Sequence, residues 1–123
     1  MHSKTSELPV TFEIPEGKIR SVEWGGMAIE TCDIQERVDP GDLFKGLPDD
    51  RCQCPHWGVV LKGTLRYRYS DHEEVYEAGD VYYAAPGHLP LLEPGLVNVE
   101  FSQAAMLAKT MEVVGRNAAA MGH

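Results

Sequence analysis

Short stretches in which apolar and polar residues alternate run through most of the chain, and glycine, proline or aspartate separates them. Side chains two positions apart fall on one face of an extended chain, so this alternation predicts half-buried β-strands. Turn signals that recur about every 8–12 positions are typical of a β-sandwich or barrel. The strands expected from the pattern are 10–14, 18–24, 27–38 with a bulge around Cys32 and Asp33, 56–62, 64–70, 73–76, 81–84, 89–92 and 96–101.

The stretch 56–62 is apolar on both of its faces, with Trp57, Val59 and Leu61 on one and Gly58 and Val60 on the other. A strand with two apolar faces in a small β-protein indicates that a second surface covers its outer side. We therefore predict a homodimer, with Trp57, Val59 and Leu61 facing away from the interior of the barrel.

The end of the chain has a different period. Five apolar residues at helical spacing predict one amphipathic helix over 103–115, with Ser102 as its N-cap and Gly115 as its stop; they are Ala104, Leu107, Ala108, Met111 and Val114. The expected organisation is a flexible tail over 1–9, an all-β barrel over 10–102, the helix packed on the barrel, and a flexible tail over 116–123.

Composition and charge narrow the possible partners of this 123-residue chain, which is long enough for one domain with a core. A net charge of −8 argues against nucleic acid and anionic membranes. Residues 1–8 lack the apolar segment of a signal peptide, and no apolar run reaches the ~20 residues of a membrane span. The 3 cysteines cannot all pair with one another, which favours reduced thiols and a cytoplasmic protein.

Candidate metal ligands occur at two places in the sequence. Cys52, Cys54 and His56 stand at alternate positions before the apolar stretch, and His88 follows the turn residues Pro86 and Gly87. Thiolates and imidazoles together favour zinc, with iron, copper, nickel or manganese as alternatives. Alternate side chains on a strand lie ~6.6 Å apart, so two of the first three residues plus His88 are a more credible ligand set than all three.

Each of these residues also has a purely structural interpretation. A buried free cysteine, Cys32 above all, is often plain packing, and His88 can simply hydrogen-bond the backbone at its turn. An imidazole that enters a buried strand, as His56 does, needs a polar partner. Five aromatic residues are either strand-core residues or the wall of a ligand pocket: Trp57, Tyr67, Tyr69, Tyr82 and Tyr83.

The block from Pro55 to Gly87 resembles the core of a small single-domain cupin. The apolar strand that ends in Lys62-Gly63 is similar to the end of the first cupin motif. Gly79-Asp80, a strand, and then Pro86-Gly87-His88 are similar to the second motif. The Cys-Pro-His-Trp-Gly segment resembles a subgroup of uncharacterised bacterial cupins. The resemblance implies a jelly-roll barrel in which the two motifs pair, and therefore predicts that His56 and His88 meet.

The chain departs from the usual cupin metal shell of three histidines and one glutamate. His56 stands at the position of the glutamate, Cys52 near the second histidine and Asp50 near the first, whereas Pro90 occupies the later place of the second-motif histidine. The resemblance therefore supports the fold and not a particular oxygenase chemistry.

Three functions are compatible with this sequence. The first is a metal-dependent enzyme with a divalent ion at the barrel mouth and a small-molecule substrate in the barrel. The second is a non-catalytic module that binds or senses a small molecule. The third is a structural dimer without metal. Fold alone does not distinguish them.

Overall fold

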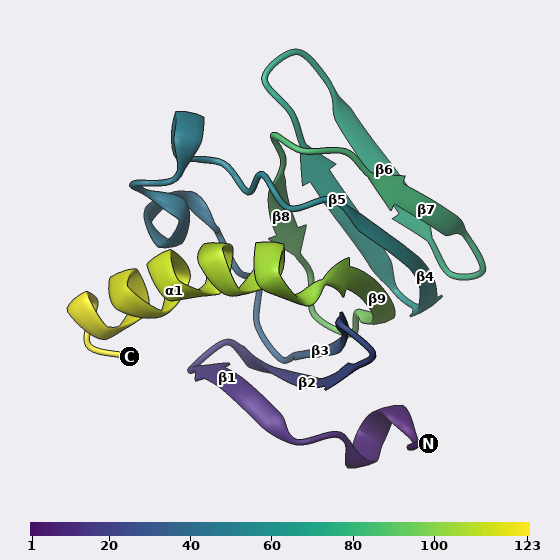
Figure 1. Ribbon diagram of the computed structural model, residues 1–123. Helices are drawn as coiled ribbons and strands as arrows, with labels where there is room; N and C mark the ends of the chain where they lie inside the picture. Colours follow the sequence, from purple (N-terminus) through teal and green to yellow (C-terminus); the bar gives the residue numbers. More distant parts are fainter.

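The computed structural model describes residues 1–123 and contains nine β-strands and a C-terminal α-helix (Figure 1). The strands are β1 (Val10–Ile14), β2 (Gly17–Trp24), β3 (Met27–Ile34), β4 (His56–Lys62), β5 (Thr64–Arg68), β6 (Glu73–Glu77), β7 (Val81–Ala84), β8 (Leu89–Leu92) and β9 (Val97–Gln103). The helix is α1 (Ala104–Ala120), and three short 3₁₀ turns are η1 (Thr5–Glu7), η2 (Gly41–Phe44) and η3 (Pro48–Asp50).

The strands form two antiparallel sheets. One has six strands in the order β1-β2-β3-β9-β4-β7, and the other has three in the order β6-β5-β8. The largest fully buried apolar side chains, those of Val60, Leu65 and Leu96, come from both sheets or from the turn between them. The all-β barrel with a C-terminal helix that the alternating pattern predicts is confirmed.

Strand β9 has its polar side chains inside the barrel. Asn98, Glu100 and Ser102 are buried, whereas Phe101 between them is 42% exposed on the outer surface. The neighbouring strand β3 places Glu30 opposite Glu100 in the register of the sheet, and Glu30 is also buried. The interior therefore contains a polar region beside its apolar core, and the site described below is built in that region.

Helix α1 follows β9 directly and lies against η2 (Figure 1). Leu107, Thr110, Val114 and Ala118 form its buried face, at the spacing of successive helical turns. The amphipathic helix predicted from the sequence is thus present. Its buried face also includes the hydroxyl group of Thr110, which points into the interior. None of the helices combines the length and the hydrophobicity that a membrane crossing needs.

Three local predictions are wrong. No bulge occurs at Cys32 and Asp33, because β2 and β3 pair without a shift, and β3 ends at Ile34. Gly115 does not stop the helix, because α1 continues to Ala120. Beyond Gly115, Ala118 is buried, and the side-chain amide of Asn117 donates to the carbonyls of Leu43 and Lys45.

Two further differences concern residues placed at the edges of elements. Ser102 is not an N-cap. It lies inside β9, and Gln103 precedes the helix without a side-chain capping bond. Leu8, which we placed in the N-terminal tail, is only 5% exposed, and its carbonyl accepts a hydrogen bond from Arg20. Its packing joins the chain start to β2.

Candidate metal centre

Cys52 and His88 are neighbours because their backbones pair. The Cys52 N–H donates to the His88 carbonyl at 2.9 Å, and the His88 N–H donates back to the Cys52 carbonyl at 3.2 Å. The Gly87 N–H shares the same Cys52 carbonyl at 2.8 Å. Gly87 adopts φ 95°, a conformation that glycine reaches without strain, and this lets the chain turn just before His88. The two side chains are therefore held at a fixed separation by the backbone.

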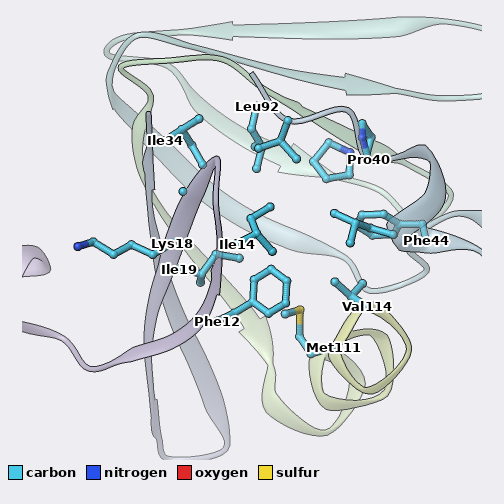
Figure 2. A pocket seen from close by; sticks show the side chains of 14 residues that line it. Phe12, Ile14, Lys18, Ile19, Ile34, Pro40, Phe44, Leu92, Met111 and Val114 are labelled. Atoms are coloured by element: carbon cyan, nitrogen blue, oxygen red, sulfur yellow. The ribbon is translucent and has the colours of Figure 1, made fainter. Parts of the chain in front are cut away.

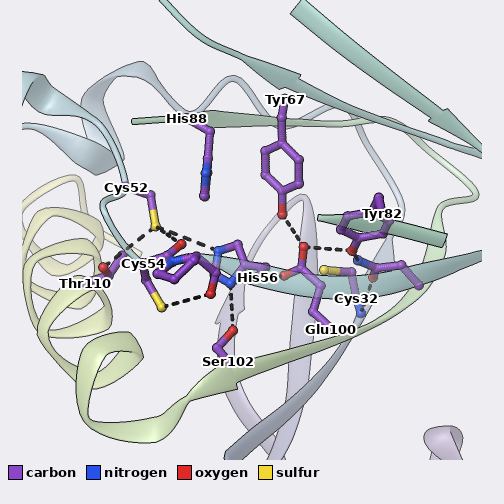
Figure 3. A network of polar contacts seen from close by, with 12 residues as sticks. Cys32, Cys52, Cys54, His56, Tyr67, Tyr82, His88, Glu100, Ser102 and Thr110 are labelled. Atoms are coloured by element: carbon purple, nitrogen blue, oxygen red, sulfur yellow. Dashed lines mark hydrogen bonds and ion pairs between the residues drawn. The ribbon is translucent and has the colours of Figure 1, made fainter. Parts of the chain in front are cut away.

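His56 enters the same region as the first residue of β4. Its side chain lies on the buried face of the strand, and its Nε2 is 3.8 Å from the Sγ of Cys52. The centre of its ring is 4.9 Å from that of His88. One ligand atom each from Cys52, His56 and His88 lies within 4.8 Å of the other two, so the three residues form a group that can hold a metal ion (Figure 3).

The Nε2 atom of His88 is buried and has no hydrogen-bond partner. The other ring nitrogen, Nδ1, lies 2.6 Å from the carbonyl of Ala85, which can only accept, so Nδ1 carries the hydrogen. Burial lowers the pKa of His88 to about 4, and His56 nearby acts in the same direction. The ring is therefore neutral near pH 7, with an unshared lone pair on Nε2, the form in which histidine binds metals.

His56 has a comparable arrangement. Its Nδ1 is 2.6 Å from the Oγ of Ser102 in the adjacent strand β9. This contact fixes the ring, and Nε2 is left facing Cys52. A metal-binding histidine usually has its second nitrogen engaged in this way by a neighbouring group.

Cys52 supplies the third ligand atom. It is 2% exposed, and its Sγ lies 3.8 Å from the hydroxyl of Thr110 on α1. Burial raises the pKa of Cys52 to about 11. The side chain is thus a protonated thiol at neutral pH, and it becomes a strong ligand only when a metal displaces the proton.

A second group of polar side chains lies next to the first. The carboxylate of Glu100 accepts hydrogen bonds from the hydroxyls of Tyr67 and Tyr82, the latter at 2.8 Å (Figure 3). Its other oxygen is 4.0 Å from Nδ1 of His56. Burial, followed by the charge of Glu100, raises the pKa of both tyrosines. Both tyrosines therefore stay protonated and act as hydrogen-bond donors to Glu100.

Glu30 adds a second buried carboxyl group. Burial, and then the charge of Glu100 in the paired strand, raise its pKa to about 8. A carboxyl group in that environment keeps its proton at neutral pH and can donate a hydrogen bond. The site therefore combines a carboxylate whose charge is stabilised by tyrosines with a neutral carboxylic acid.

These groups surround a small cavity of about 80 Å³. Its wall includes Cys52, His56 and His88 together with Tyr67 and Glu100. The ring of Tyr67 is 4.5 Å from that of His88, between centres. A cavity volume of roughly 10–15 Å³ on this scale is enough for one water molecule, so the cavity admits several water-sized groups beside the three candidate ligands.

The structure separates the sequence-predicted site residues into two sets. Cys52, His56 and His88 come together, and Tyr67 and Tyr82 border Glu100. The thiol of Cys54 is buried, but it points to the carbonyl of Pro55 at 3.5 Å and is not in the group of three.

The other three aromatic residues do not face the site cavity. Trp57 and Tyr83 are 45% and 50% exposed on the outer surface, where their rings contact each other, because they alternate with inward-facing Gly58 and Tyr82. Their assignment to the pocket wall is wrong. Tyr69 is half-buried, with its hydroxyl donating to the carbonyl of Ala85.

Sequence reasoning missed Glu30, Glu100, Ser102 and Thr110. For Glu100 and Ser102 the signal is inconspicuous: polar residues alternate with apolar ones along β9, which normally indicates that the polar residues face solvent. In β9 the polar side chains of Glu100 and Ser102 face the interior and the apolar ones face outward. Only the pairing of β9 between β3 and β4 shows which face is inside.

No protein-family model matches the chain, and no curated protein sequence matches it significantly. Solved structures do share its fold. An RmlC-like cupin from Shewanella frigidimarina superposes with a TM-score of 0.57 at 11% identity, covering 83% of this chain and 88% of that one. A protein of unknown function from Rhizobium leguminosarum gives 0.58 at 12% identity, covering 83% and 94%. The chain therefore has a small cupin fold, as its motifs predict.

Oxalate decarboxylase from Bacillus subtilis, a longer protein, has the same fold over part of its length. A variant of that enzyme superposes with a TM-score of 0.52 at 14% identity, covering 80% of this chain and 28% of that one. The Bacillus subtilis enzyme has Mn(II) centres. The cupin fold thus includes metal-containing enzymes, and at these identities the similarity concerns the fold alone.

Proposed function

We propose that the protein is a small metal-binding cupin in which Cys52, His56 and His88 bind one divalent ion, zinc in the first place. The observation that carries this proposal is the buried Nε2 of His88, which has no partner and belongs to the same group as Cys52 and His56. A buried nitrogen lone pair without a partner is costly. A metal ion in that position satisfies it.

The distances and the donor types support zinc. Two ligand atoms of a tetrahedral zinc ion lie roughly 3.5 Å apart, given bonds of ~2.0–2.3 Å, and the Cys52 Sγ to His56 Nε2 distance is 3.8 Å. One thiolate and two imidazoles leave the fourth position open, as in catalytic zinc sites. Iron, copper, nickel and manganese remain the alternatives for this donor set.

The surrounding residues supply a chemistry for the open position. A divalent ion bound there would act as a Lewis acid on an oxygen atom of a ligand or a water molecule. Glu100, 4.0 Å from His56, is placed to accept a proton, while the hydroxyls of Tyr67 and Tyr82 hold its carboxylate. Protonated Glu30, opposite Glu100 in the sheet, is the complementary donor. This pairing of an acid and a base favours an enzyme over a passive binding module.

Elemental analysis of protein purified without an affinity tag tests the site. We expect stoichiometric metal in the parent protein and its loss in Cys52→Ser, His56→Ala and His88→Ala. Cys54→Ser, a neighbouring buried thiol outside the group, and His72→Ala, an exposed imidazole, are matched controls that keep the metal. Absence of metal from the parent after growth with added zinc, iron and manganese, or full occupancy in the three variants, contradicts the proposal. Turnover of candidate substrates then separates an enzyme from a binding module.

We further propose that the protein is a homodimer whose interface is the outer face of β4, β7 and β9. Trp57 pairs with Tyr83 on one side and Phe101 on the other, and all three aromatic side chains are 42–50% exposed. Leu61 and Val81 extend the same apolar patch. Contiguous apolar patches of this kind mark protein interfaces, and a second copy of the chain offers the same uncharged surface.

Three free cysteines agree with a cytoplasmic location.

A further inference from the structure

A second cavity lies next to the candidate metal centre, and nearly all of the residues that line it are apolar (Figure 2). Phe12 and Ile14 of β1, Ile34 of β3, Leu43 of η2 and Val114 of α1 line it, and its volume is about 80 Å³. Lys18 is the only charged residue on its border, and Figure 2 shows the amino group of Lys18 pointing away from the space. This cavity has no hydrogen-bonding group for a polar ligand, whereas an apolar ligand can pack against its hydrocarbon walls.

The apolar cavity and the metal-centre cavity share a wall. Ile19, Phe44, Pro90, Leu92 and Met111 line both of them. The two cavities therefore adjoin across these side chains: one presents Cys52, His56 and His88, and the other presents only hydrocarbon. Met111 stands at the boundary, and its unbranched side chain adapts readily to a neighbouring group.

We propose that the apolar cavity binds the hydrocarbon part of a small amphiphilic ligand whose oxygen head group binds the metal at Cys52, His56 and His88. This inference rests on the proposed metal site and adds the ligand class: a short aliphatic chain, or a single ring, with one polar end. The cavity is partly open at the protein surface, and apolar side chains that border such a space without filling it contribute less to stability than packed ones. Larger side chains at Val114 or Val38 would fill it, so the space is consistent with a ligand.

A series of alkyl hydroxamic acids tests the inference, because all members share one metal-binding head. Protein loaded with Co²⁺ is titrated with acetohydroxamic, butanohydroxamic and hexanohydroxamic acid, and binding is followed by the visible spectrum of the cobalt ion. Each methylene group that enters an apolar site contributes about 0.8 kcal/mol, roughly a fourfold gain in affinity. We expect that gain along the series until the cavity is full.

Variants locate the tail of the ligand. Val114→Phe fills the apolar cavity without touching the metal-centre cavity and should abolish the gain with chain length, while acetohydroxamic acid binds as before. Val113→Phe, the same substitution at the next position and outside both cavities, should keep the full gain. Should Val114→Phe fail to fold, Val114→Ile adds one carbon at the same place and should remove about one fourfold step.

The outcomes separate the two proposals. Protein that takes up no Co²⁺ overturns the metal site and the ligand class together. A bound cobalt ion whose spectrum does not respond to any hydroxamic acid overturns the ligand class and leaves the metal site standing. Binding of all three acids with equal affinity leaves the metal site standing and overturns the apolar subsite. A gain with chain length that survives unchanged in folded Val114→Phe also overturns it, because the tail then lies elsewhere.

Discussion

The Nε2 atom of His88 and the Sγ atom of Cys52 face a common space because the two residues exchange backbone hydrogen bonds in both directions. This pairing joins the loop that precedes β4 to the turn that precedes β8, and it involves backbone atoms alone. Ligand atoms that the backbone fixes in advance lose little freedom on binding. The candidate centre is therefore largely formed before an ion arrives.

The turn before His88 should depend on glycine. Gly87 has φ 95°, and a Cβ there would meet no atom within 4 Å, so Gly87→Val introduces backbone strain and no clash. We expect a loss of about 1–3 kcal/mol in the free energy of unfolding, measured by urea denaturation. Gly87→Asn is the matched control and should lose less, since asparagine tolerates positive φ. An unchanged stability in Gly87→Val contradicts the role of this turn.

Ser102 should control metal affinity without being a ligand. Its Oγ lies 2.6 Å from Nδ1 of His56, so Ser102→Ala releases the ring from its fixed orientation. We expect the dissociation constant of the metal to rise about 10–100-fold, measured by competition with a coloured chelator. Stoichiometry at saturating metal should remain that of the parent. An unchanged dissociation constant would show that Ser102 does not position His56.

Glu30 should make the stability of the metal-free protein fall as pH rises. Its pKa is about 8 in the folded protein and 4.5 ordinarily, so between these values the unfolded chain has lost a proton that the folded protein keeps. The contribution is fully present below about pH 4.5 and is lost as pH rises toward 8. We therefore expect Glu30→Gln to gain stability relative to the parent across this range.

Urea denaturation at pH 5, 6, 7 and 8 in the presence of a chelator measures this difference. The lowered pKa of His88 acts in the opposite direction, destabilising the fold as pH falls below 6.5, but it is common to both proteins and cancels. Parallel pH profiles for the parent and Glu30→Gln would mean that Glu30 is not held in its neutral form.

Replacing Gly115 by alanine should stabilise the protein. It lies inside α1 at negative φ, and a Cβ there would meet nothing within 4 Å. Because glycine is a poor helix former, Gly115→Ala should raise the free energy of unfolding by about 0.5–1 kcal/mol. A thermal melt of the two proteins measures it. A decrease would indicate that the helix is interrupted at Gly115.

Trp57 should hold the proposed dimer together. Trp57→Glu places a charge in the middle of the exposed aromatic patch and should give a monomer of 13.6 kDa, with the parent near twice that mass by light scattering. Val75→Glu is the matched control, since Val75 is 43% exposed on β6 in the other sheet. A parent that is monomeric at micromolar concentration rules out the interface.

Much of the candidate centre follows from the sequence, in particular from residues at the ends of expected strands. The Cys52–His56 segment and the Pro86-Gly87-His88 turn stand at the places where the two cupin motifs end, so their meeting was predictable. The sequence did not predict which of the two cysteines, Cys52 or Cys54, lies beside the histidines. That depends on the bend between Cys52 and the start of β4, which brings the Cys52 thiol to His56 and turns the Cys54 thiol toward Pro55.

Local patterns determined the elements of this protein, and the tertiary structure determined their faces. Alternation marks a strand whichever side is buried, because its period of two is the same for both faces. On β9 the apolar side chains of Val99 and Phe101 lie outward, and Asn98, Glu100 and Ser102 lie inward. Only the pairing of β9 with β3 and β4 sets that orientation. The buried carboxylate of Glu100 and the hydroxyl of Ser102 then find their partners on β4, β5 and β7.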